Sequence, residues 1–265
     1  GRNELLLRVA ASPMRERLRA PLLQIGPSPE VQPVYDQRLF WIRTMPQITA
    51  LVCMLVAALV LCVWWRRPGE LLYGLFGIAA ALWGVRTLTF VIERMPAAQW
   101  HGWRVAYLGA TSGFIVVLAV FSLRLAGLRR PRLERALLAF GALGPLWLLL
   151  AGEGSEALVN RVWSAALIPV GLGILGLAGW TVARQRTWAS AVLPAAMGLA
   201  VLAGLHDYLM AWDDGVLARL WPQWVHQRIF LLHHSANLVL VAMGGLLAAR
   251  FIHTLSALQE LNQTL

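Results

Sequence analysis

Lysine is absent from this sequence, and all 23 basic residues are arginine. A retinal-binding protein attaches its chromophore to a lysine as a Schiff base, so that class of membrane protein is excluded. Charged residues of both signs are scarce, at 14% of the chain, whereas soluble domains have about a quarter. Cysteine is limited to Cys53 and Cys62, which lie inside an apolar run where no extracellular disulfide would form.

Apolar residues make up 58% of the chain, and they occur in runs of about twenty, the length that crosses a bilayer. Seven such runs are far more than a soluble core uses. The sequence therefore predicts an all-α membrane protein, a bundle of seven transmembrane helices within residues 45–252. The expected spans are residues 45–65, 71–92, about 105–126, 136–151 (short, and containing Pro145), about 158–183, about 189–212 and 229 to about 252.

The arginines are distributed unevenly between the connections that join these spans. The connections after the first, third and fifth spans are rich in arginine, whereas those after the second, fourth and sixth hold most of the acids. Because short cytoplasmic loops carry an excess of Lys and Arg, we expect the odd connections to face the cytoplasm. The N-terminus would then lie outside and the C-terminus in the cytoplasm.

Residues 1–44 do not have the membrane pattern. Residues 3–9 alternate apolar and polar side chains, as in a β-strand, and residues 22–25 are a second candidate strand. A strand with an unpaired edge does not stand alone, so we expect these strands to complete an external β-domain that lies upstream. Residues 31–45 are expected to form a short helix that leads into the first span.

Past Arg250 the apolar residues recur in alternating steps of four and three, which is a heptad pattern. We expect residues 253–265 to begin a cytoplasmic signalling helix that joins two copies as a homodimer. Asn262 occupies a core position of the heptads, where a polar residue fixes the register of a coiled coil. The alternative is a frayed amphipathic tail on the membrane, since two heptads are few. The seam residues are Leu255, Leu258, Asn262 and Leu265.

Several polar residues lie within the predicted spans, where a charge is costly and usually faces a partner inside the bundle. Arg86, Asp207 and His233 each lie five to seven residues from a charged residue at the outer end of their span, which is roughly 8 to 11 Å along a helix. The sequence thus predicts that three helices bring Arg, Asp and His to one level in the outer leaflet. The candidate sensing or ligand-binding residues are Arg86, His206, Asp207, His233, His234 and Asn237.

Two interpretations of this cluster stay open. In the first, Arg86 pairs with Asp207 and the histidines line a water-filled pocket, which binds an unknown external ligand or senses pH. In the second, the same pair only locks two helices together. A metal site is less favoured and we expect none, because adjacent residues such as His233 and His234 point about 100° apart on a helix.

The order of an external β-segment, seven spans and an exit helix resembles the bacterial seven-transmembrane receptors with diverse intracellular signalling modules. Three local stretches carry the resemblance: GRNELLLRV at residues 1–9, PVYDQRLFWIRTMPQ at residues 33–47 and ALQELNQTL at residues 257–265. It implies an external jelly-roll domain, similar to carbohydrate-binding modules, and a cytoplasmic output such as a histidine kinase or diguanylate cyclase. The exit helix resembles those that precede dimeric histidine kinases. The resemblance implies no particular ligand-binding residue, and we expect the chain to be a piece of a longer protein.

We therefore expect the transmembrane sensory module of a bacterial two-component receptor. One alternative is a small-molecule transporter, which predicts inverted repeats and broken helices. The other is an intramembrane metal-dependent hydrolase that uses the His and Asp residues. The sequence has no nucleotide-binding loop and no nucleophile beside a base, so we expect this chain alone to catalyse nothing and to need no cofactor. The arginines lie between apolar runs, so membrane lipid is the expected partner and nucleic acid is not.

Overall fold

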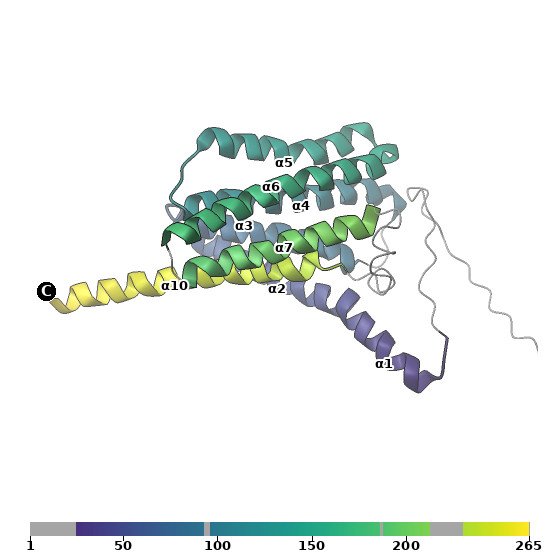
Figure 1. Ribbon diagram of the computed structural model, residues 1–265, viewed down its shortest axis with the longest axis horizontal. Helices are drawn as coiled ribbons and strands as arrows, with labels where there is room; N and C mark the ends of the chain where they lie inside the picture. The colour runs from purple at the N-terminus through teal and green to yellow at the C-terminus, as the bar shows by residue number, and fades with distance from the viewer. Residues whose placement is uncertain (1–24, 93–95, 186–187, 213–229, 265) are drawn as a thin grey trace, which may run out of the picture.

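The computed structural model describes residues 25–92, 96–185, 188–212 and 230–264, and every regular element in these ranges is a helix (Figure 1). The expected strand at residues 3–9 lies outside the described residues. So does the second candidate strand except for Ile25, which belongs to no helix or strand.

The first span begins with a helical lead-in, as the sequence predicts for residues 31–45, and the helix starts slightly earlier, at Ser28. Helix α1 (Ser28–Leu39) continues through a short π-helix, η1 (Phe40–Thr44), into α2 (Met45–Arg66). Proline near the start of α1 is compatible with a first helical turn, where the missing N–H has no intrahelical acceptor, whereas Pro46, the second residue of α2, closely follows the π-helix. The lead-in and the first span are therefore one continuous helical segment, Ser28–Arg66.

Six further helices correspond to the remaining predicted spans, and the described residues contain seven helices long and apolar enough to cross a membrane. The predicted seven-helix architecture is thus confirmed by length and composition, as for a multi-pass membrane protein. The fourth span begins five residues earlier than expected, at Pro131. The helices are α3 (Leu71–Thr87) with the 3-10 turn η2 (Leu88–Phe90), α4 (Ala97–Leu125), α5 (Pro131–Ala151) followed by the 3-10 turn η3 (Glu153–Ser155), α6 (Glu156–Gln185), α7 (Trp188–Trp212) and α10 (Leu232–Thr264).

The connection between α4 and α5 is short because its glycine reverses the chain in a few residues. Gly127 has φ +74°, which side chains disfavour, and Leu128 N–H donates to the Leu123 carbonyl at 2.9 Å. Across the turn, Arg124 donates to Glu134 at 2.6 Å. The two helices are therefore held as antiparallel neighbours.

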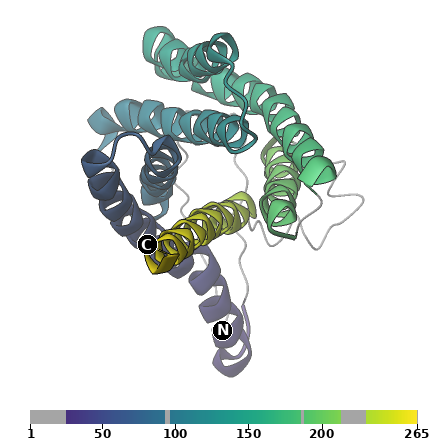
Figure 2. The same cartoon turned by 90° about the vertical axis from the view of Figure 1, so that its left-hand side faces the viewer.

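Five of the helices form a ring, which Figure 2 shows along the bundle axis. Going round it, α3 packs on α4, α4 on α6, α6 on α7, α7 on α10, and α10 on α3. Helices α2 and α5 lie outside this ring, α2 against α3 and α5 against α4 and α6. Helix α10 is the longest, and its C-terminal part projects beyond the other helices in Figure 1.

The outer surface of the bundle is apolar, as a lipid-facing surface must be. Leu59, Leu150 and Val241 are 67%, 85% and 72% exposed, which would be unfavourable in water for a surface covered with such residues. The interior has a main apolar core shared by α2, α3, α4, α6, α7 and α10, and a smaller one in which Trp163 of α6 packs beside Leu148 of α5. The second core attaches α5 to the bundle.

Gly144→Ala in α5 is expected to destabilise the protein, because the new Cβ would lie 2.4 Å from Cδ2 of the Trp163 ring. Overpacking costs about 1–3 kcal/mol, more than the gain of up to about 1 kcal/mol from replacing a helical glycine. The melting temperature of the purified protein in detergent should fall. Gly173→Ala in α6 is the matched control, since its Cβ would meet nothing within 4 Å. Equal melting temperatures for the two variants would contradict this packing between α5 and α6.

Candidate ligand cavity

A cavity of about 890 Å³ lies inside the five-helix ring. Its described lining comes from α3 and η2, α4, α6, α7 and the start of α10, and from neither α2 nor α5. Along α4 the lining residues run from Arg104 to Leu118, and along α6 from Glu156 to Ile174. The cavity therefore lies toward the end of the bundle in which α6 and α10 begin, and it reaches past the middle of α4 and α6 without reaching their C-terminal ends. Its size falls within the range of about 300–1,000 Å³ that small-molecule sites have.

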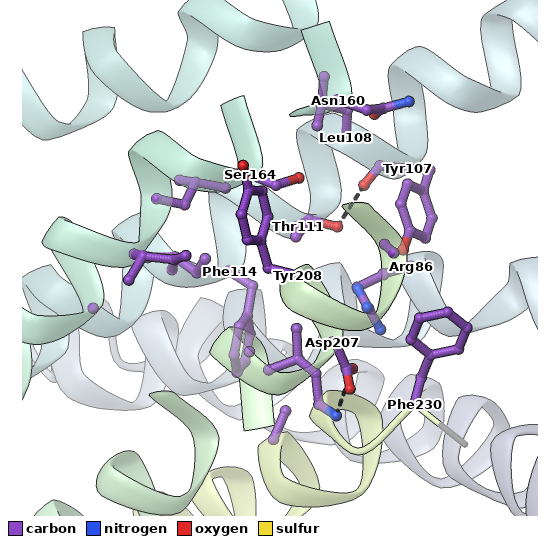
Figure 3. Close-up of a pocket in the computed structure, with 18 of the residues that line it drawn as sticks. Arg86, Tyr107, Leu108, Thr111, Phe114, Asn160, Ser164, Asp207, Tyr208 and Phe230 are labelled. Carbon is purple, nitrogen blue, oxygen red and sulfur yellow. Dashed lines mark hydrogen bonds between the residues drawn. The ribbon is translucent and has the colours of Figure 1, made fainter. Parts of the chain in front are cut away.

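Arg86 projects into this cavity from the last turn of α3, and its side chain is buried, with 6% exposed. Its Nε and Nη1 atoms are buried with no hydrogen-bond partner among the described residues. The guanidinium carbon lies 4.4 Å from the ring centroid of Trp83 and 5.4 Å from that of Tyr107. Figure 3 shows the guanidinium directed into the space between Tyr107, Asp207 and Phe230. The cation is thus held by aromatic faces, while its hydrogen-bond donors remain available.

Asp207 of α7 lines the same cavity and is buried, but it does not form the ion pair with Arg86 that the sequence suggested. Its two carboxylate oxygens accept the backbone N–H groups of Leu231 at 2.8 Å and Leu232 at 2.9 Å. These N–H groups belong to the start of α10 and lack an intrahelical acceptor. The negative charge of a carboxylate here also interacts favourably with the positive end of the helix dipole. The interaction with the helix terminus therefore takes the place of the expected salt bridge.

The three candidate histidines lie near this end of the bundle but not on the cavity wall. His206 Nδ1 is 3.0 Å from Asp207 Oδ1. The His233 ring packs against Phe90 at a centroid distance of 5.4 Å, and the His234 ring against Trp41 at 5.2 Å. The predicted common level of Arg, Asp and His thus brings them to the same end of the bundle, where the His233 and His234 rings also contact each other at a centroid distance of 3.7 Å.

Asn237, the last candidate, joins three helices. It accepts a hydrogen bond from Trp83 Nε1 at 3.2 Å and donates one to Thr49 Oγ1 at 2.8 Å. These contacts link α10 to α3 and α2 and account for both polar ends of the amide. Asn237 does not line the cavity, and its contribution is to fix Trp83, on which the Arg86 guanidinium lies.

The cavity also contains residues that the sequence analysis did not select. Arg104 of α4 donates to Glu156 of α6 at 2.5 Å, and Asn160 donates to the same carboxylate at 3.4 Å. Trp83 and Arg86 are three residues apart on α3, so they share a helix face, and this spacing is the signal from which Trp83 could have been found. The pairing of Arg104 with Glu156 had no such signal, because the two residues are far apart in the chain.

The charges that line the described part of the cavity do not balance. Arginine contributes Arg86, Arg104 and the exposed Arg161, whereas the acids are Glu156 and Asp207. Within the described residues, no group of three or more His, Cys, Asp or Glu side chains is placed to hold a metal ion. The arrangement can therefore bind an anion through Arg86, while Phe114, Leu118 and Met197 offer an apolar wall.

Comparison with known proteins gives no match to a family model, a curated protein or a solved structure.

Asp207→Asn is expected to destabilise the start of α10, because an amide has one acceptor oxygen for the two N–H groups that the carboxylate binds. A hydrogen bond to a charged group contributes about 1.5–3 kcal/mol, so the free energy of unfolding should fall by that order. Hydrogen exchange at the Leu231 and Leu232 amides should accelerate. Glu153→Gln makes the same chemical change at an exposed position of η3 and should alter neither quantity. Unchanged exchange at Leu231 and Leu232 in Asp207→Asn would show that the carboxylate does not cap α10.

Proposed function

We propose that this chain is the transmembrane sensory module of a bacterial receptor in the inner membrane. In this proposal a stimulus acts at the cavity, and α10 passes the response to a cytoplasmic output domain, for which a histidine kinase is the first candidate. The family resemblance described for residues 1–9, 33–47 and 257–265 agrees with this assignment. The chain itself is expected to have no catalytic activity.

The observation that carries the proposal is the continuity of α10. It runs from Leu232, beside the cavity, to Thr264 without a break, over 33 residues. A helix of that length measures about 50 Å. The hydrocarbon core of a bilayer is about 30 Å thick. Helix α10 therefore has the reach to cross the membrane and extend well beyond it, and a displacement at its N-terminus would reach the other side.

The arginines support an orientation with the C-terminus in the cytoplasm. Helices α2, α4, α6 and α10 run in one direction, so their C-terminal ends gather at the same end of the bundle. That end has Arg66 and Arg67 after α2, a group of arginines between α4 and α5, and Arg250 in α10. By the positive-inside rule this is the cytoplasmic end. The cavity then opens toward the outer leaflet.

A dimer through the end of α10 remains part of the proposal. The helix extends over three of the four predicted seam residues and ends just before Leu265, which lies outside the described residues. Leu255 is 44% exposed, so one seam position is free to contact a second copy. The side chains of Leu258 and Asn262 also lie outside the described part of the structure.

The alternatives fit less well. A transporter needs a path that reaches both sides, but the cavity lining stops at Leu118, Ile174 and Met197, and α6 continues without a break past Pro169. A metal-dependent hydrolase would need its histidines to converge. His233 and His234 contact each other, but among the described residues no group of three or more His, Cys, Asp or Glu side chains is placed to hold a metal ion.

A spin label at His253→Cys, an exposed position on α10, tests both the dimer and the coupling. Cys53→Ala and Cys62→Ser remove the native thiols. In nanodiscs that hold two copies, we expect one defined distance between the two labels, measured by double electron–electron resonance. Adding Asp207→Asn should shift that distance, because the substitution weakens the attachment of α10 to α7.

The matched control places the label at Leu143→Cys, an exposed position on α5, which makes no contact with α10 among the principal helix pairs. Its distance distribution should not respond to Asp207→Asn. The absence of any distance between labels at position 253 would contradict the dimer. A defined distance that Asp207→Asn leaves unchanged would contradict transmission through α10.

A further inference from the structure

The guanidinium of Arg86 is the one charged group lining the described cavity that is buried and has no salt bridge. Arg104 and Glu156 neutralise each other, Asp207 binds the start of α10, and Arg161 is exposed. A buried charge within a membrane is costly unless it is paired or hydrogen-bonded. Arg86 has aromatic contacts on Trp83 and Tyr107, which favour a cation but leave Nε and Nη1 without acceptors.

The free donors of Arg86 define the chemistry of the missing partner. A guanidinium presents its N–H groups in a planar fork, which matches the two oxygens of a carboxylate or phosphate. Because Trp83 and Tyr107 hold the guanidinium, the fork has a fixed direction, into the cavity (Figure 3). Arg86 is the one buried arginine of the described lining without a salt bridge, so one oxyanion group would satisfy it. The partner is therefore a monoanion.

The rest of the cavity defines what is attached to that anion. Away from Arg86 the wall is mostly apolar and includes the buried side chains of Phe114, Leu118, Ile174 and Met197. Thr111, which lies in this region, donates its hydroxyl hydrogen to the Tyr107 carbonyl at 2.9 Å. Ser164 and Tyr208 add hydroxyl groups to the lining. A ligand body that is mainly apolar gains from burial against the apolar side chains.

The shape of the ring limits the width of the ligand. Each of the five helices packs on the next, so helices border the cavity around the ring, and the cavity is partly open. It extends to the ends of the helices beside Glu156 and Phe230. A volume of about 890 Å³ has room for a ligand with a single chain or a flat apolar body.

From these observations we propose that the cavity binds an amphiphilic monoanion, whose oxyanion head lies on Arg86 and whose single apolar tail lies between α4, α6 and α7. Its role as the stimulus rests on the proposed sensory function, but its binding does not. Asn237 of α10 accepts a hydrogen bond from Trp83, and Trp83 contacts Arg86. The head group on Arg86 is therefore connected to α10 through these two contacts.

Equilibrium binding of radiolabelled decanoate to the purified protein tests the proposal. The protein is placed in phosphatidylcholine nanodiscs, and empty nanodiscs correct for partition into lipid. We expect saturable binding of decanoate, and none of decanol or decyltrimethylammonium, which keep the tail but change the head. Arg86→Gln should weaken decanoate binding by about tenfold to a hundredfold, which corresponds to the loss of a charge-assisted hydrogen bond. Arg250→Gln, the same change at the exposed far end of α10, should leave it unchanged.

Two further variants separate a binding role of Arg86 from a structural one. Arg86→Met removes the unpaired charge and should not lower the melting temperature without decanoate, but it should abolish the rise that decanoate produces. A large fall without decanoate would assign Arg86 a structural role and overturn the proposal. Arg86→Lys keeps the charge without the fork, so it should bind decanoate with intermediate affinity. If Arg86→Gln does not fold, the decanoate affinity of Arg86→Lys tests the binding role of Arg86 in its place.

Changing the lipid of the nanodisc tests whether the anion comes from the membrane or is a free amphiphile. An anionic phospholipid offers the same oxyanion head, so phosphatidylglycerol nanodiscs should weaken decanoate binding if the leaflet supplies the ligand. Equal binding in both nanodiscs would assign the site to a free amphiphile. Binding of decanol as tight as that of decanoate, or no saturable binding of decanoate in either lipid, would overturn the proposal.

Measurements in the same nanodiscs distinguish a failure of the proposed binding site from a failure of the proposed sensory function. Decanoate binding that leaves the distance between labels at position 253 unchanged would contradict the sensory function while retaining the site. A change of that distance in Asp207→Asn, together with no decanoate binding, would retain the function and remove the site.

Discussion

A bilayer offers no water to the backbone groups at a helix terminus, so each terminus near the hydrocarbon needs an acceptor or donor from the protein. The carboxylate of Asp207 meets this need for α10 by binding the N–H groups of Leu231 and Leu232. That contact joins the end of α7 to the start of α10 and closes one side of the helix ring. The cavity depends on it, because α7 and α10 supply two of its five walls.

The same contact decides the charge of the cavity. Because Asp207 is engaged with the backbone, it does not pair with Arg86, and the guanidinium is buried without a salt bridge. Aromatic faces hold the cation, and Asn237 in turn holds Trp83. A polar group fixed in this manner is preorganised for an anion and needs no rearrangement to bind it. The geometry thus favours recognition over a purely structural ion pair.

Helix α10 is attached at separate points along one side. Asp207 binds its first turn, Asn237 connects it to α2 and α3, and the Tyr73 hydroxyl donates to the Leu247 carbonyl at 3.3 Å. Beyond that point the helix leaves the bundle (Figure 1). A ligand can shift such an element only through different affinities for two of its positions. The link from Arg86 through Trp83 to Asn237 is a direct route by which an anion would have that effect.

The sequence by itself determined the class, the number of spans and the end of the bundle where the polar residues gather. Spanning length, arginine distribution and helical rise depend only on residues close in the chain, and the long lead-in at residues 31–45 followed from the same local pattern. Only the tertiary structure decided which groups are partners. From the sequence, the Asp207 carboxylate could bind either the Arg86 guanidinium or the N–H groups at a helix terminus. The order of the helices around the ring places it at the start of α10. The pairing of Arg104 with Glu156 could likewise not be predicted from the sequence. A contact between distant segments depends on helix packing, which no local pattern encodes.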